Sequence, residues 1–521
     1  MISARRQATH TLNVRLVLFL QRFGIGGTAA RQLACALGLA SGSRSFGNFT
    51  SLEEEIALHQ IKLGEEIIAE NVQKEMDMSP IGVDGRKNMG TGMDTGWTQR
   101  GTGKQYNSDS GISIMFGQLT KLVVAFYYMS KVCAKCKLAT EHGKPLCSRN
   151  HEGSSKGMEA DGGLQNVMSI YDNYPAYVGT VVTDDDSSCR SILSHPYKVQ
   201  REIAKEEGRE FIWPTYPGGG KKPSVGLLPK HHPPITFLAD VNHRLRAMFG
   251  KIFALSRKKK SDSLVTSMDA HRLKRNFTMA IFSNQGEEFP VFVCMAVNVL
   301  EHHFGIHDNC GDEWCPFNRN KDKPEKQKEL FYRNKENATD KKNYKHIKPI
   351  FNTYCSEKKM RFIYHIFSTN SCENMNKVFT KYIRKDSYLC GTVVGKGRAL
   401  MAVGVESLGY EKYFSRLFNS LGADFDENME EHCKNLDVSR QKQYEYHKSQ
   451  IFLTKRAIRK SERVAKEVQK EKKDRLKGKT YKKRMAAPKV SVGDGGDSKA
   501  TGERKYYGMQ QLISISISTL V

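Results

Sequence analysis

The chain has 521 residues, enough for about two to four domains and for a large core that needs no disulfides. Lysine and arginine number 82 and aspartate and glutamate 56, so the formal charge is +26. This excess argues against a neutral metabolic enzyme and for a polyanionic partner, nucleic acid before an anionic membrane. No run of 18 apolar residues occurs, so we expect no membrane-spanning helix. Twelve cysteines are too few for a disulfide scaffold.

The N-terminal part, residues 1–78, predicts a helical segment. Residues 1–52 contain six arginines and no acidic residue, as in a mitochondrial presequence. No small-residue cleavage site stands out, and we favour a basic helical segment. Ser51 and Glu54 have the spacing of a capping box at a helix start.

The middle of the chain predicts a mixed α/β core. Glycine and polar residues dominate positions 79–111, and apolar, β-branched or aromatic runs then alternate with helical patterns. We expect strands at 112–117, 120–129, 176–182 and 235–240, and helices at 163–174 and from 241. The expected parts are a helical N-terminal segment (1–78), a first core part (79–260) with a Cys/His insertion (133–151), a helical insertion (261–365), a second core part (366–425) and a basic tail (426–521), a helix or a partly disordered arm.

Three acidic residues are candidates for metal-dependent chemistry. Asp94 lies in a glycine-rich stretch, Asp184 ends an expected strand, and Glu373 begins an expected helix. Carboxylates that converge on two Mg²⁺ ions can cleave phosphodiesters. Structural interpretations remain open for each residue. Asp84 rivals Asp94 as a turn aspartate, Asp184 could cap a helix with Asp185 and Asp186 beside it, and Asn370 with Glu373 fits a capping box.

Several segments together resemble a Mutator-like transposase domain, a DDE transposase with an RNase H-like core. They are DTGWTQRGTGKQYNSDSG (94–111), CAKC and GSSKGME (133–159), VVTDDDSS (181–188), DVNHRLR (240–246), HHFGIHDNCGDEWC (302–315), TNSCENMN (369–376) and the block at 395–422. The likeness spans roughly residues 20–425, and the order of the motifs is more specific than any one of them.

The resemblance implies catalytic roles for Asp94, Asp184 and Glu373, with Asp186 as the alternative to Asp184. It implies an RNase H-like mixed sheet with a large helical insertion, because 189 residues separate Asp184 from Glu373. Two Mg²⁺ ions would activate water or a DNA 3′-hydroxyl and stabilise the leaving oxygen. The stretch before Asp94 is a poor strand, so the sequence specifies this catalytic strand weakly.

Two Cys/His clusters predict structural zinc sites, since four protein ligands leave no position for substrate. The first comprises Cys133, Cys136, His142 and Cys147, with His151 as a spare ligand. It could instead be a loop of free thiols.

The second cluster comprises His303, His307, Cys310 and Cys315, with His302 as a substitute for His303. His303 and His307 are four residues apart and share one helix face.

Asp240 and His243 follow a strand and could lie near the carboxylates. We favour a helix cap for Asp240 and a surface position for His243.

Basic segments predict contacts to DNA phosphates. The candidates are Arg257, Lys258, Lys259 and Lys260, and in the tail Lys482, Lys483 and Arg484. The tail between positions 455 and 489 carries sixteen basic and four acidic residues.

We therefore expect a nuclear, zinc-stabilised, Mg²⁺-dependent transposase that acts on double-stranded DNA, both transposon ends and target, with no membrane partner and with homo-oligomerisation left open. The alternative is a domesticated or inactive relative that binds DNA without cutting it. A third class is an RNA-binding zinc-knuckle protein.

Overall fold

The computed structural model describes residues 4–23, 49–82, 85–98, 108–133, 147–184, 187–193, 205–208, 232–256, 265–328, 332–384 and 391–476, with isolated positions between them. Contacts divide the chain into two units, residues 1–473 and 474–521, and the elements below belong to the first, except the last few residues of the final helix. No helix in the described part is long and apolar enough to cross a membrane.

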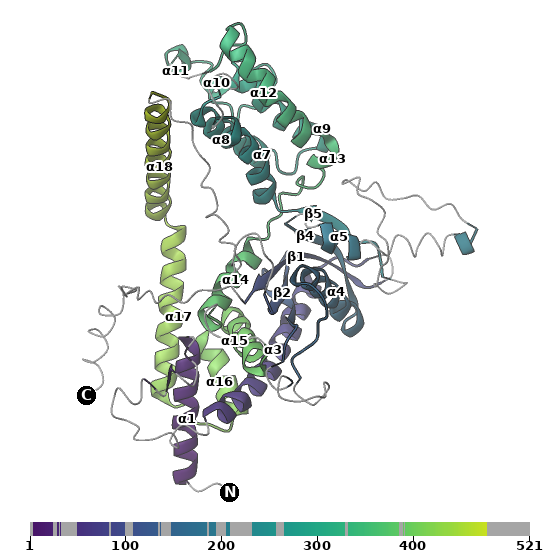
Figure 1. The fold of residues 1–521 in the computed structure, drawn as a ribbon, viewed down its shortest axis with the longest axis vertical. Coiled ribbons are helices and arrows are strands. Elements are labelled where there is room, and N and C mark those ends of the chain that lie inside the picture. The colour runs from purple at the N-terminus through teal and green to yellow at the C-terminus, as the bar shows by residue number, and fades with distance from the viewer. Residues whose placement is uncertain are drawn as a thin grey trace, which may run out of the picture. The chain divides into compact units, whose positions relative to one another are not determined.

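A five-stranded mixed sheet lies within the first unit (Figure 1). Its strands are β1 (Lys87–Trp97), β2 (Ser110–Gly117), β3 (Val123–Ser130), β4 (Ala176–Thr183) and β5 (Thr236–Ala239), in the order β3-β2-β1-β4-β5. β1 pairs antiparallel with β2 and parallel with β4. The predicted strands at 112–117, 120–129, 176–182 and 235–240 are confirmed. The central strand β1, however, lies in the stretch where we expected no good strand.

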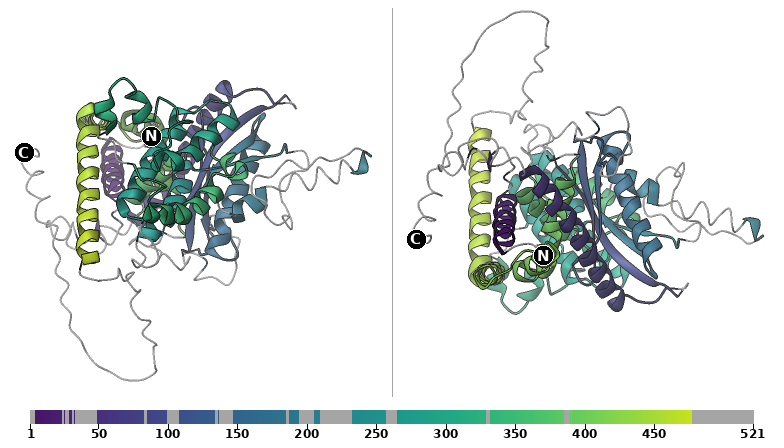
Figure 2. Two further views of the ribbon diagram at one scale, coloured as in Figure 1. Left: turned by 90° about the horizontal axis from the view of Figure 1, so that it is seen from above. Right: turned by 90° about the horizontal axis from the view of Figure 1, so that it is seen from below.

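Helices cover both faces of the sheet, as the two views of Figure 2 show. On one face α4 (Ser155–Asn173) packs over a core that includes Met89, Met93 and Met115. On the other face lie α3 (Phe49–Met78), α14 (Asn370–Tyr382) and α15 (Val393–Leu408), over a core that includes Ile112 and Ile114. The alternation of Ile114 and Met115 between the two cores follows from the two-residue period of a strand.

The chain between β5 and α14 is helical and has a hydrophobic core of its own. Its helices are α7 (Val241–Ser256), α8 (Ser267–Ser283), α9 (Phe289–His303), α10 (Pro316–Arg319), α11 (Pro324–Lys328), α12 (Ala338–Tyr354) and α13 (Glu357–Met360). The helix expected from position 241 is confirmed, with Leu245, Met248, Phe249 and Ile252 buried. Phe253 on the same helix is only partly buried.

The remaining helices are α1 (Ala4–Arg22), α5 (Ser187–Leu193), α16 (Tyr410–Ser420), α17 (Glu427–Lys448) and α18 (Gln450–Leu476). The expected helices near the N-terminus are present as α1 and α3. The capping box at Ser51 is wrong, because α3 begins at Phe49 and Ser51 lies inside the helix. The part of α18 whose side chains are described is almost entirely exposed.

Candidate functional site

Asp94 on β1 and Asp184 at the end of β4 lie side by side on one face of the sheet. In the parallel ladder of these strands Gly92 lies opposite Val182. Asp94 and Asp184 each follow that pair by two residues, so their side chains point to the same face as the pair. This is the face covered by α14, because Cys372 of α14 donates a hydrogen bond to the Gly92 carbonyl (3.3 Å).

An extra residue in β4 sets this alignment. Met89 lies opposite Val178, but Gly90 lies opposite Thr180, so Gly179 is left over as a bulge. The bulge reverses the alternation of side chains, and Val178 and Val181 therefore both pack on the α4 face. If Gly179 instead paired with Gly90 and the ladder continued regularly, Asp184 would turn away from Asp94, because a slip of one residue exchanges the two faces of a strand.

Glycines on β1 let α14 approach the strand closely. A Cβ added to Gly96 would lie 2.4 Å from Oδ1 of Asn376, so no larger side chain fits there without movement. Asn376 donates a hydrogen bond from Nδ2 to Oδ2 of Asp94 (2.8 Å). Glu373 lies three residues before Asn376, which is nearly one helical turn, and so the first turn of α14 brings Glu373 to the edge of the Asp94 site.

Glu373 does not form the capping box that its spacing allows. Thr369 is the N-cap residue of α14 and its side chain makes no capping hydrogen bond, while the Ser368 hydroxyl accepts from the Asn370 N–H (3.2 Å). The Glu373 carboxylate instead lies 3.7 Å from Nε2 of His243 and 3.7 Å from a guanidinium nitrogen of Arg246. Both partners belong to α7, so the helical insertion contributes to the site.

His243 lies between two of the three predicted carboxylates. Its Nδ1 is 3.1 Å from Oδ2 of Asp184, and its Nε2 faces Glu373. The expectation of a plain surface histidine is therefore wrong. The expectation for Asp240 holds, since the backbone N–H of His243 donates to Oδ1 of Asp240 (2.8 Å) at the start of α7.

Burial and the nearness of other carboxylates determine the electrostatics of the site. Burial, and then the neighbouring Asp184, raise the pKa of Asp94 from 3.8 to about 7. Burial also raises the pKa of Asp184, against the opposing effect of His243. Oxygen ligands in this arrangement suit a hard divalent cation such as Mg²⁺, which would relieve the repulsion. The alternatives Asp84, Asp185 and Asp186 lie outside the described residues.

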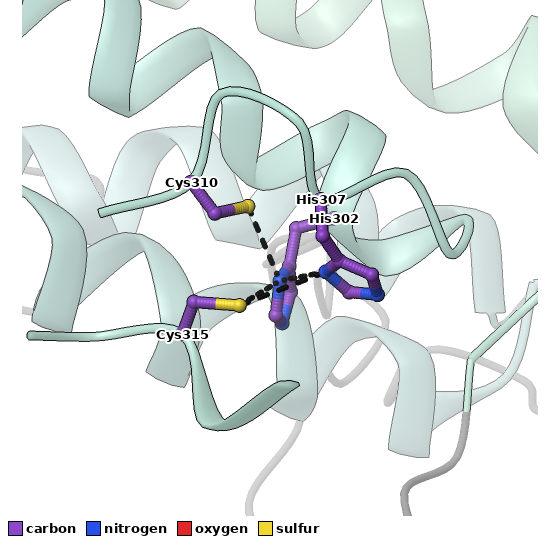
Figure 3. A group of neighbouring side chains, drawn as sticks. All are labelled: His302, His307, Cys310 and Cys315. Carbon is purple, nitrogen blue, oxygen red and sulfur yellow. Dashed lines mark hydrogen bonds between the residues drawn. The ribbon is translucent and has the colours of Figure 1, made fainter. Parts of the chain in front are cut away.

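A second candidate site lies in the helical insertion, where two histidines and two cysteines point toward one another (Figure 3). The ligand atoms of His302, His307, Cys310 and Cys315 all lie within 4.8 Å of one another. Nδ1 of His302 is 3.1 Å from Nδ1 of His307 and 3.5 Å from Sγ of Cys315. Zinc bonds of 2.0–2.3 Å imply tetrahedron edges of about 3.3–3.8 Å, so these side chains fit one zinc ion.

The surroundings of this group favour a structural site. Phe317 stacks on His307 with ring centroids 4.2 Å apart, and Trp314 is buried beside His302. Hydrogen bonds, first from Cys310 and then from His302 and His307, lower the pKa of Cys315, which suits a thiolate ligand. Four protein ligands leave no open position for substrate.

The prediction of His303 as a ligand in this cluster is corrected to His302. His303 instead lies 3.4 Å from Oδ1 of Asp269, which also binds Arg333 (2.8 Å). The spacing of four residues pointed to His303 and His307, but α9 ends at His303. His307 therefore lies beyond the helix, and a spacing of four residues does not indicate which histidine faces it.

The first Cys/His cluster is partly described. The sulfur atoms of Cys133, Cys136 and Cys147 lie within 4.8 Å of one another, with Cys136 and Cys147 3.3 Å apart. His142 lies outside the described residues. The spare ligand His151 is bound elsewhere, with Nδ1 2.7 Å from Oδ2 of Asp161. The three thiols could hold zinc together with one further ligand.

The basic residues that we predicted as DNA contacts, Arg257 to Lys260 and Lys482 to Arg484, lie outside the described residues. A described basic surface lies on α12, where a groove of about 610 Å³ is lined by Lys335, Lys341, Lys345 and Lys348 together with Tyr344 and Glu336. Lys341, Lys345 and Lys348 are exposed and recur at helical spacing along one face. The search for dense basic runs in the sequence missed this surface, because its lysines are spread over two turns of a helix.

Comparison with known families identifies a match in the N-terminal part of the chain. Residues 2–207 match the family model of the Mutator-like transposase, and the resemblance expected from the motifs is confirmed over this part. The matched part contains Asp94, Asp184 and the first Cys/His cluster, whereas Glu373 and the second cluster lie beyond it. No curated protein and no solved structure matches the chain.

Proposed function

We propose, from the Mutator-like transposase match over residues 2–207, that the chain is a DNA transposase that acts in the nucleus. Asp94, Asp184 and Glu373 are its catalytic carboxylates. The observation that carries this proposal is the placement of Asp94 beside Asp184 on one sheet face, with α14 bringing Glu373 to the same place.

The sheet supports an RNase H-like interpretation of the core. Two of the carboxylates come from the adjacent parallel strands β1 and β4, and the third comes from a helix that packs on their shared face. Functional side chains commonly gather at the ends of neighbouring strands in α/β folds. The helical insertion between β5 and α14 explains the long interval between Asp184 and Glu373.

The residues present fit divalent metal, and magnesium bound there would neutralise the charge that develops on the phosphate and activate the attacking hydroxyl. The chain's own residues orient the carboxylates. Asn376 and the Thr95 N–H (2.8 Å) hold Asp94, while Thr369 donates to Oδ1 of Asp184 (3.2 Å). Arg246 is more than half exposed beside Glu373 and is placed to meet a DNA phosphate near the site.

DNA binding requires a positive surface, and the α12 groove supplies one. α18 adds a second, with ten basic and four acidic residues along an exposed helix. Lysine contacts to phosphates contribute affinity without base recognition. The Cys/His clusters stabilise the chain around these surfaces.

A nicking assay on supercoiled DNA tests the proposal. Purified protein should nick DNA with Mg²⁺ and stop when EDTA is added. Asp94→Asn, Asp184→Asn and Glu373→Gln should each reduce nicking to background, while Asp172→Asn, at an exposed position on α4, should leave it unchanged. DNA binding should survive in all four variants. Binding without nicking in the unmodified protein would favour the domesticated or inactive relative instead.

A further inference from the structure

The Asp240 carboxylate lies within hydrogen-bonding distance of four donors at the junction between the sheet and the helical insertion. It directly follows β5 and is only 1% exposed. Its Oδ1 accepts from the backbone N–H of His243 (2.8 Å). Its Oδ2 accepts from the Ser368 hydroxyl (2.7 Å), from the Thr369 N–H (2.7 Å) and from the Thr369 hydroxyl (3.2 Å).

The same Thr369 hydroxyl reaches one of the proposed catalytic carboxylates. Its Oγ1 is 3.2 Å from Oδ1 of Asp184 and 3.2 Å from Oδ2 of Asp240, and Thr369 is 1% exposed. A hydroxyl has one proton to donate and two lone pairs, so Thr369 links the two carboxylates without being able to satisfy both at once. Thr369 is also the residue from which α14 begins.

We propose that Asp240 is a positioning residue that, through Thr369, holds Asp184 and the Glu373 helix in their working arrangement. This inference rests on the proposed function of those carboxylates. We assign Asp240 a supporting role and not metal ligation, because it is 1% exposed and hydrogen-bond donors contact both of its oxygens. These bonds, set against burial, keep the pKa of Asp240 below its ordinary value, so the carboxylate stays charged and accepting.

The need for such a link follows from the topology. The chain leaves the sheet after β5, forms the helical insertion, and returns at the residues before α14. Its entry and exit lie side by side, since the Ala239 N–H donates to the Phe362 carbonyl (3.0 Å) and the Val241 N–H to the Phe367 carbonyl (3.3 Å). The Asp240 side chain joins the two passages through Ser368 and Thr369, and Asn242 adds a hydrogen bond from Nδ2 to the Ser368 hydroxyl (3.2 Å). Movement of the insertion would otherwise shift Glu373 relative to Asp184.

The same residue fixes His243. By capping the start of α7, Asp240 sets the rotation of that helix and therefore the position of the imidazole between Asp184 and Glu373. One buried carboxylate thus orients groups from β4, α7 and α14. Replacing a residue that orients metal ligands through hydrogen bonds typically lowers activity or metal affinity by about 10–100-fold.

A pair of substitutions at Thr369 gives the sharpest test. Thr369→Val keeps the shape and the backbone N–H but removes the hydroxyl, whereas Thr369→Ser keeps the hydroxyl. We expect Thr369→Val and Asp240→Asn to lower the single-turnover nicking rate by about 10–100-fold and to raise the Mg²⁺ concentration that gives half the maximal rate. In Thr369→Ser the nicking rate and the half-maximal Mg²⁺ concentration should both stay near those of the unmodified protein. The Kd for duplex DNA should be the same in all of these variants.

A second measurement does not depend on nicking. Amide hydrogen exchange at positions 369–376 should be faster in Asp240→Asn and Thr369→Val than in the unmodified protein and in Thr369→Ser, while exchange in β4 stays the same. An unmodified protein that never nicks DNA would overturn the proposed function, and the exchange comparison would still decide the link. Equal exchange at 369–376 in all variants, or equal rates and metal dependence in Thr369→Val and Thr369→Ser, would overturn the positioning role.

Discussion

Asp94 and Asp184 share one face of the sheet because β4 leaves Gly179 unpaired, as a bulge between the pairs Met89–Val178 and Gly90–Thr180. Before this bulge, the residues of β4 that face α4 are even-numbered, and after it they are odd-numbered, as Val178 and Val181 show. The position of a proposed catalytic carboxylate thus depends on how the strand accommodates an extra residue five positions earlier.

Deletion of Gly179 should remove the bulge and leave the carboxylate site in place. Thr180 would directly follow Val178, so the pairs Met89–Val178 and Gly90–Thr180 would belong to one regular ladder with Asp184 still on the Asp94 face. We expect Mg²⁺-dependent nicking and DNA binding both to persist, measured on supercoiled plasmid and by fluorescence anisotropy.

Gly179→Ala is the matched control, since it keeps the extra residue. The added Cβ would meet only the end of the Asn88 side chain, at 1.9 Å, and that side chain can rotate away. This variant should retain most of the nicking activity. Loss of nicking in the deletion variant, with nicking retained in Gly179→Ala, would show that pairing on either side of the bulge is not enough to place Asp184 beside Asp94.

The stability of the metal-free protein should fall as pH rises from about 4 to about 7. Burial and Asp184 raise the pKa of Asp94 from 3.8 to about 7, so the folded state binds a proton in this interval that the unfolded state has lost. The free energy of unfolding then decreases with pH, by roughly 4 kcal/mol at completion, since each pKa unit corresponds to about 1.4 kcal/mol. Chemical denaturation in EDTA at pH 4.5, 6 and 8 measures this change.

Asp94→Asn should remove much of this dependence and should stabilise the metal-free protein at pH 8, because the amide carries no charge to bury. Mg²⁺ at pH 8 should stabilise the unmodified protein but not the variant. Identical pH profiles for the two proteins would argue against a strained carboxylate at position 94.

The order of strands and helices could largely be predicted, because apolar runs at positions such as 112–117 and 176–182 carry a strong local signal. The strand β1 could not, because its glycines have low strand propensity and it is stabilised by neighbours on both edges and both faces. Motif resemblance still placed Asp94 correctly beside Asp184. The roles of His243, Thr369 and Asn376 depend on contacts across the insertion, which spacing along the chain does not encode.

Zinc in the helical insertion should depend on His302 and not on His303. His302→Gln should lose about one zinc per chain by elemental analysis, compared with the unmodified protein. The free energy of unfolding of the insertion should fall by at least about 3 kcal/mol, because structural zinc contributes about 10–16 kcal/mol in small zinc-binding peptides.

His303→Gln is the matched control from the neighbouring position. It removes an ion pair with Asp269, but Arg333 still binds that carboxylate, so zinc content should stay unchanged and the loss of stability should be small. Loss of zinc in His303→Gln with retention in His302→Gln would restore the assignment made from spacing.

The α12 groove should contribute DNA affinity that depends on salt and not on sequence. Lys341, Lys345 and Lys348 are exposed on one helix face and line the groove with a single acidic residue, Glu336. Changing these three lysines to glutamine should weaken binding to all duplexes alike. The slope of log K against log salt should become shallower by about 2–3 units, since each lost phosphate contact removes about 0.9.

The same charge change at Lys321, Lys323 and Lys326 provides the control, since these exposed lysines belong to the same helical insertion but lie outside the groove. Binding is measured by anisotropy with two unrelated duplexes at four salt concentrations.

A general effect of net charge would give both triple variants the same slope, and the groove would then have no special role. A change in preference between the duplexes would instead mean that the groove reads bases. We expect neither, because lysine binds phosphate as a point charge and the groove offers only Tyr344 and Asn352 as further polar side chains besides Lys335 and Glu336.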